Sequence, residues 1–161
     1  MRWWRHAIAD RADVRRAFPD DALDRIERAI GEAETRHAGQ IVFAIEPALP
    51  VARVFANVSP RERALEVFGL LRVWDTEDNN GVLVYLMLAD HDVEIVADRG
   101  IHQHVGDAAW QAICERMEAS FREGRFEAGV VAGIDAISAR LAEAFPRGKG
   151  GNELPNRPVV I

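Results

Sequence analysis

The chain has 161 residues, of which 48% are hydrophobic and 29% charged, a balance typical of one folded domain and unlike that of a disordered chain. Its net charge of −6 argues against the broad basic surface that nucleic-acid binding requires, and its single cysteine excludes an internal disulfide. The sequence contains no run of about 18 apolar residues, so no direct membrane span is predicted. We therefore expect a cytoplasmic protein, free or peripheral to the membrane, without a nucleic-acid partner.

The first part of the chain predicts two helical segments. Residues 7–18 are arginine-rich and weakly amphipathic, and Pro19 interrupts them, so residues 1–17 are interpreted as an N-terminal helical arm. A longer amphipathic helix is predicted to follow and to end near His37. Its apolar residues at helical spacing are Leu23, Ile26, Ile30 and Ala33.

Apolar runs separated by a helix predict two parallel strands. Residues 40–45 form the first run, and residues 82–89 are apolar at every position, as in a strand that is covered on both faces. Between them, Ser59 and Pro60 are the predicted N-cap and first residue of a crossover helix. The residues assigned to the inner face of this helix are Ala64, Leu65, Phe68 and Leu71.

A β-hairpin is predicted after the second strand. If residues 90–91 form a two-residue turn, the antiparallel pairing places Leu83 opposite Asp98. Residues 93–98 mostly alternate between apolar and polar, as in a strand near a sheet edge. The sheet is therefore expected to be mixed, with its third strand antiparallel.

Two helices are predicted to complete the domain. Asp107 can cap the first of them, and Pro146 follows the second. Residues 147–161 are interpreted as an irregular C-terminal tail, although the apolar end at residues 158–161 could add a strand to a sheet edge or to a partner. The predicted fold class is a three-layer α/β/α sandwich, with a small mixed sheet and helices on both faces.

Residues with metal-ligating oxygens flank the hairpin. The five candidate ligands are Asp75, Asp78, Asn79, Asp98 and Asp107. The predicted pairing brings residues 75–81 and residues 98–107 to the same end of the sheet, so that their oxygens could together bind Ca²⁺ or Mg²⁺. The alternatives are turn chemistry for the three residues before the second strand, a strand end for Asp98 and helix capping for Asp107.

Two other sites are weighed against this one. His102 and His104 could bind a transition metal through neutral imidazole, although solvated loop histidines are far commoner. Ligands of open α/β sheets also bind beyond the carboxyl ends of parallel strands, which here lie near Glu46 and residues 90–92.

Several segments together resemble the TPM domain family over about residues 20–145. The segments are Trp74 to Leu83, the turn Asp98-Arg99-Gly100-Ile101, Asp107, Phe126 to Val130, and Gly133-Ile134. The best marker is Asp78-Asn79-Asn80-Gly81-Val82-Leu83, which is similar to the family's Asp-Asn-Gly-Val-Leu. Residues 18–146 are therefore interpreted as a TPM-like domain.

The resemblance implies an α/β/α sandwich and, in some members, divalent-cation binding or weak acid phosphatase activity. Asp78 and Asn79 match the family's motif before the strand, and Asp107 matches its aspartate after the third strand. Many members carry a membrane anchor, which is not expected here, so that a role at a membrane complex would need a partner protein.

Two functions remain open from the sequence. The first is a non-catalytic binding or assembly module of the TPM type, cation-bound at residues 75–81 and 98–107 and acting with a membrane-associated partner. The second is a cation-dependent acid phosphatase of phosphomonoesters, in which metal-bound water attacks phosphorus and Arg99 helps to bind phosphate. No nucleophile is recognisable, because Ser59 is a predicted cap and Cys114 lies on an apolar helix stripe.

Overall fold

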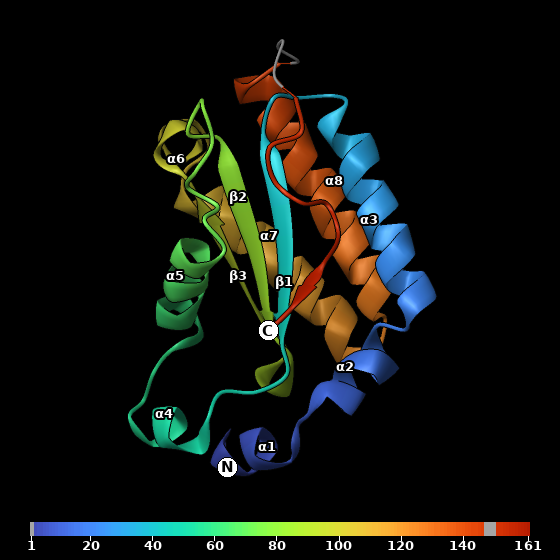
Figure 1. Cartoon of the computed structure of the whole chain (residues 1–161), viewed down its shortest axis with the longest axis vertical. Coiled ribbons are helices and arrows are strands. Elements are labelled where there is room, and N and C mark those ends of the chain that lie inside the picture. The colour runs from blue at the N-terminus through green and yellow to red at the C-terminus, as the bar shows by residue number, and fades with distance from the viewer. Residues whose placement is uncertain (1, 147–150) are drawn as a thin grey trace.

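The computed structural model describes residues 2–146 and 151–161, in which helices cover a four-stranded sheet (Figure 1). The helices are α1 (Arg2–Ile8), α2 (Arg11–Ala17), α3 (Asp20–Glu34), α4 (Val51–Phe55), α5 (Pro60–Leu70), α6 (Arg99–Val105), α7 (Asp107–Arg122) and α8 (Phe126–Ala144). The strands are β1 (Gln40–Glu46), β2 (Gly81–Met87), β3 (Asp92–Ala97) and β4 (Val159–Val160). Their order in the sheet is β3-β2-β1-β4.

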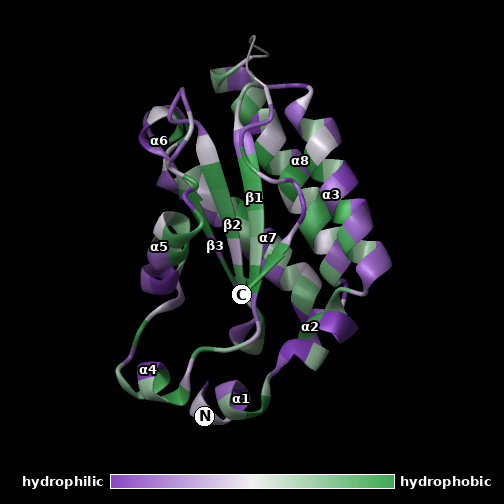
Figure 2. Ribbon diagram, in the orientation of Figure 1, coloured by the Kyte–Doolittle hydropathy of each residue, from purple (hydrophilic) through white to green (hydrophobic). Residues whose placement is uncertain are grey.

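Strands β1 and β2 lie between two layers of helices. They pair in parallel, and every residue of both is buried. Side chains such as Phe43 belong to the core that includes α3, α7 and α8, whereas their neighbours, such as Val42, belong to the core that includes α4 and α5. Figure 2 shows the two strands as mainly hydrophobic ribbons between helices of mixed hydropathy. The predicted three-layer α/β/α sandwich is confirmed.

The hairpin is antiparallel as predicted, but the predicted register differs from the observed one by two residues. Leu83 lies opposite Val96, not Asp98. The connection is longer than a two-residue turn because residues 88–90 form a single 3₁₀ turn and His91 adopts a left-handed conformation with φ of 54°. A shift of two residues leaves each side chain on its predicted face.

Three local predictions differ from the structure. Residues 98–107 were expected to be a loop, but Asp98 caps helix α6, and Asp107 lies in the first turn of α7 without capping it. Leu65 is 51% exposed, because Val67 takes its expected place facing the sheet. The arm forms two short helices, the second of which begins with a capping box at Asp10.

The C-terminal end forms an edge strand of the sheet. Residues 147–150 of the predicted tail lie outside the described residues. Val159 and Val160 form β4, which pairs in parallel with Ala44 and Ile45 of β1. The interpretation of the tail as irregular throughout is therefore wrong, and the alternative of an added edge strand is confirmed. No helix in the described ranges is both long and apolar enough to cross a bilayer.

Gly81 provides a test of the close approach that positions β2. A Cβ atom at this residue would lie 2.0 Å from the backbone oxygen of Val73, so that Gly81→Ala forces backbone to move. We expect the free energy of unfolding in urea to fall by about 3 kcal/mol, at the upper end of the range for overpacking. Gly69→Ala, in α5 with nothing within 4 Å, is the control and should be neutral or slightly stabilising. Equal stability of the two variants would contradict the packing.

Candidate functional site

Two segments from either end of the hairpin meet beside the start of β2. The Asp98 N–H donates to the Gly81 carbonyl at 2.9 Å, and the Gly100 N–H donates to the Asn79 carbonyl at 3.1 Å. A Cβ atom at Gly100 would lie 2.6 Å from the Asn79 oxygen and 3.0 Å from the Asp78 oxygen, so glycine permits the contact. The predicted meeting of the two ligand-rich segments is therefore confirmed, although in a different register.

Asp98 is the most informative residue of this region. Its side chain is buried, and Oδ1 accepts a hydrogen bond from the Arg99 N–H at 2.7 Å, which begins α6. Its second oxygen, Oδ2, is buried without a hydrogen-bond partner among the described residues. A buried carboxylate oxygen without a partner is energetically costly, so the local chemistry favours a cation or another donor beside it.

Asn80 is a second polar residue here, and it was not among the predicted ligands. It is 1% exposed, its Nδ2 donates to the Ala38 carbonyl at 2.6 Å, and its N–H donates to Thr76 Oγ1 at 3.1 Å. Its Oδ1 is buried without a partner in the described part of the chain. The signal in the sequence was the doubled asparagine of the marker motif, in which the second residue directly precedes the buried strand.

The other predicted ligands before β2 are more exposed. The Asp75 carboxylate accepts a hydrogen bond from Arg72 at 2.7 Å, and Asp78 is exposed. Asn79 is half-buried and adopts φ of 50°, a left-handed conformation that asparagine tolerates in turns. These side chains therefore lie in a solvated turn, and the carbonyls of Asp78 and Asn79 are its closest approach to Gly100.

His102 and Asp107 lie together in a different place. His102 Nδ1 is 3.7 Å from Asp107 Oδ1, and both residues line a groove of about 560 Å³ along β3 to which Asp78 and Asp98 do not contribute. His104 instead packs edge-on against Phe145. Within residues 2–146 and 151–161, no three His, Cys, Asp or Glu side chains are clustered for metal binding.

The groove along β3 is acidic. Burial, followed by the negative charges of Glu94 and Glu118, raises the pKa of Asp92 to about 7. The outer edge of β3, which pairs with no strand among the described residues, is bonded to side chains instead. The Val93 N–H donates to Glu118 at 3.1 Å, and the Ile95 carbonyl accepts from Arg61 at 2.7 Å. Side chains thus cover part of an edge that could otherwise pair with another strand.

The carboxyl ends of the parallel strands are occupied by internal contacts on one side. Glu46 accepts hydrogen bonds from Arg63 at 2.8 and 3.0 Å and from the Tyr85 hydroxyl at 2.6 Å, and burial together with the Glu46 charge raises the pKa of Tyr85. Asp90 contacts both Arg2 and His6 of the arm. Glu46 and Asp90 of this rival site are therefore engaged by the fold and the arm, whereas Asp92 Oδ1 is buried without a hydrogen-bond partner among the described residues.

Three serines and the single cysteine of the chain are possible nucleophiles. Burial raises the pKa of the Cys114 thiol to about 12, so it is protonated at neutral pH. Ser59 caps α5 in a capping box with Glu62. Ser138 is buried against His37, and Ser120 hydrogen-bonds to the Arg116 carbonyl. None of these groups is arranged as an activated nucleophile.

The structure is a small α/β/α domain in which the polar segments before β2 and after β3 meet at one end of the sheet. A family model described as the TPM domain matches residues 12–140, so the chain belongs to the TPM domain family. The chain is similar to the NMR structure of the BA42 protein from the psychrophilic bacterium Bizionia argentinensis, with 30% identity and a TM-score of 0.79, over 89% of this chain and 95% of that one.

A second solved structure shares the fold at lower identity. It is the N-terminal domain of a protein from P. gingivalis, with 17% identity and a TM-score of 0.64, over 83% of each chain. No curated protein matches the sequence.

The raised pKa of Asp92 gives a prediction about pH. The pKa is about 7 in the folded state, against an ordinary value of 3.8 for an aspartate, so the folded protein holds a proton that the unfolded chain has lost between these values. Stability from this group is therefore present at low pH and is lost as the pH rises through about 7. We expect Asp92→Asn to raise the melting temperature at pH 8 and to change it little at pH 4.

Differential scanning calorimetry at several pH values measures this effect. Asp135→Asn is the matched control, because it makes the same substitution at an exposed position on α8 and should change the melting temperature little. An Asp92→Asn variant less stable than the native chain at pH 8 would contradict the assignment.

Proposed function

We propose that this TPM domain is a non-catalytic binding module whose stability depends on a divalent cation, Ca²⁺ or Mg²⁺, at the meeting point of residues 75–81 and 98–107. The observation that carries the proposal is the buried Asp98 carboxylate with one oxygen lacking a partner among the described residues. A hard cation would offset the cost of that burial, and oxygen is the ligand type that both ions prefer.

The residues present fit an oxygen-ligated cation better than a transition metal. Asp98 would supply the buried carboxylate, and Asp78 an exposed one from the facing turn. Backbone carbonyls of this turn and water would complete the shell, as is common for Ca²⁺ and Mg²⁺. His102 and Asp107 line the groove along β3 and Asp98 does not, so we do not propose that these three residues bind one ion together.

The second part of the proposal concerns the partner. We infer that the domain acts with a protein partner, and that this partner belongs to a membrane-associated complex. Two findings support a binding role: the named hydroxyl and thiol groups are engaged or protonated, and the cation region lies at a loop end of the sheet, where binding residues commonly occur.

Thermal unfolding of chelator-treated protein tests the cation. At a 100-fold excess of ion over its dissociation constant, binding should stabilise the fold by about 2.7 kcal/mol, which corresponds to a rise of about 5–10 °C in Tm. Asp98→Asn retains a helix-capping side chain but removes the charge. We expect this variant to lose the rise, and to be at least as stable as the native chain when chelator is present.

Two comparisons make this experiment specific. Asp135→Asn removes an exposed carboxylate on α8 and should keep the full rise. Asp78→Ala should weaken the response without abolishing folding, since Asp78 is exposed. No rise with Ca²⁺, Mg²⁺ or Mn²⁺ at saturating concentration, or an equal rise in the native and Asp98→Asn proteins, would overturn the cation site.

The phosphatase alternative is tested by activity. Phosphomonoesters should not be turned over by the native protein in the presence of Mg²⁺, Ca²⁺ or Mn²⁺. Sustained hydrolysis that is lost in both Asp78→Ala and Asp98→Asn would replace the binding module by a metal-dependent phosphatase, in which Arg99, exposed at the start of α6, contacts the phosphate.

A further inference from the structure

An open pocket of about 530 Å³ lies at the opposite end of the sheet from the Asp98 region. Leu88 and Ala89, which directly follow β2, form one wall, and the N-terminal arm and the start of α8 form the others. The pocket is thus beyond the carboxyl end of a parallel strand, where open α/β sheets commonly bind ligands. Its size is within the usual range for small-molecule sites.

The lining of this pocket is mainly apolar. Ile8 of the arm, Leu88 after β2 and Phe126 of α8 contribute its large apolar side chains. Ile8 is 58% exposed, so part of this apolar surface is open to a ligand. A compact hydrocarbon or aromatic body would be removed from water by these residues.

Among the charged side chains that line the same pocket, the one left unpaired within the described residues is positive. Arg5, Arg16 and His91 line it, and Asp13 is the acidic group among them. Asp13 is already engaged, because its carboxylate caps the Asp10 N–H and pairs with Arg16. Arg5, in contrast, makes no side-chain hydrogen bond or ion pair within the described residues. An anionic group would therefore find an available guanidinium beside an apolar surface.

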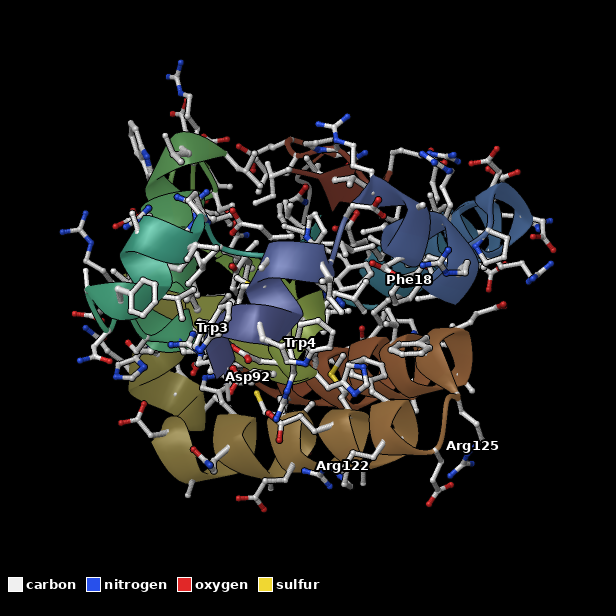
Figure 3. The ribbon with its side chains drawn as sticks, turned by 90° about the horizontal axis from the view of Figure 1, so that it is seen from below. Trp3, Trp4, Phe18, Asp92, Arg122 and Arg125 are labelled. Carbon is white, nitrogen blue, oxygen red and sulfur yellow. The ribbon has the colours of Figure 1, made fainter. Side chains whose placement is uncertain are left out.

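The surroundings of His91 independently indicate positive charge. After burial, the charges of Arg5 and Arg122 are the next largest causes that lower the pKa of His91. Figure 3 shows this end of the molecule, with Trp3 and Trp4 on α1, Arg122 at the end of α7 and Arg125 at the N-cap of α8. Arg122 is paired with Glu118 and Arg125 with Glu123, so Arg5 is the arginine of this group that an anionic ligand could engage.

We propose that this pocket is a binding site for a small organic carboxylate with a compact apolar body, such as an aryl acid. The carboxylate would pair with Arg5, and the apolar body would pack against Ile8, Leu88 and Phe126. This site uses none of the residues proposed to bind the cation.

A titration of the ¹⁵N-labelled full chain with 2-naphthoate, followed by NMR, tests the proposal. The amide signals of Ala9, Ala89 and Gly124, which line the pocket, should shift saturably, with a dissociation constant of about 1 mM or tighter for a ligand of this size. The neutral analogue 2-naphthamide should bind at least about tenfold more weakly, because it lacks the charge that Arg5 recognises.

Matched variants distinguish binding in this pocket from non-specific attraction of the carboxylate to the arginine-rich arm. Arg5→Gln should weaken binding about fivefold. Arg11→Gln, on the same arm but outside the lining, should leave it unchanged. Ala17→Leu should block binding by filling the pocket, and Arg5→Gln remains informative if this variant does not fold. Absence of saturable shifts, equal binding of 2-naphthamide, unchanged affinity in Arg5→Gln, or shifts centred on Asp98 would each overturn the proposal.

Discussion

The burial of β1 and β2 on both faces is the constraint on which the rest of the molecule depends. Every residue of the two strands is buried, so each face needs its own helical layer. A charge within this pair is tolerated only with partners. Glu46 has two of them, Arg63 and Tyr85, and loss of either would leave a buried charge or polar group unsatisfied. Polar chemistry is therefore displaced to the ends of the strands.

The two proposed sites lie at opposite ends of the parallel pair and offer different side chains. Before β2, buried oxygens of Asn80 and Asp98 lack hydrogen-bond partners among the described residues. Beyond β2, Arg5 and His91 lie beside apolar side chains of the arm and α8. The first environment favours a cation and the second favours an organic anion. The two proposed sites are thus separated by the length of the sheet and by the apolar cores on its two faces.

The two buried strands could be predicted because each is an almost uninterrupted run of apolar residues. The hairpin register could not be predicted. The connection of the hairpin contains a 3₁₀ turn at residues 88–90, and Asp90 of this turn contacts Arg2 and His6 far away in the chain. A tertiary contact of this kind has no local signal. Helix α6 was missed for a different reason: the segment after β3 was interpreted as a turn rich in metal-ligating residues, whereas Asp98 begins a helix there and Gly100 is required by its contact with Asn79.

The meeting of the two segments at the candidate cation site could be predicted, but which of the five candidate side chains is buried there could not. Sequence type alone cannot distinguish Asp98 from Asp107, and burial does: Asp98 is 7% exposed, and the Asp107 side chain is 87% exposed. That burial follows from backbone contacts, since the N–H groups of Asp98 and Gly100 are bonded to the carbonyls of Gly81 and Asn79. Because the same contacts join β3 to the start of β2, an ion bound there would stabilise the sheet directly. Cation binding and folding would thus be linked through shared backbone contacts, without a separate conformational change.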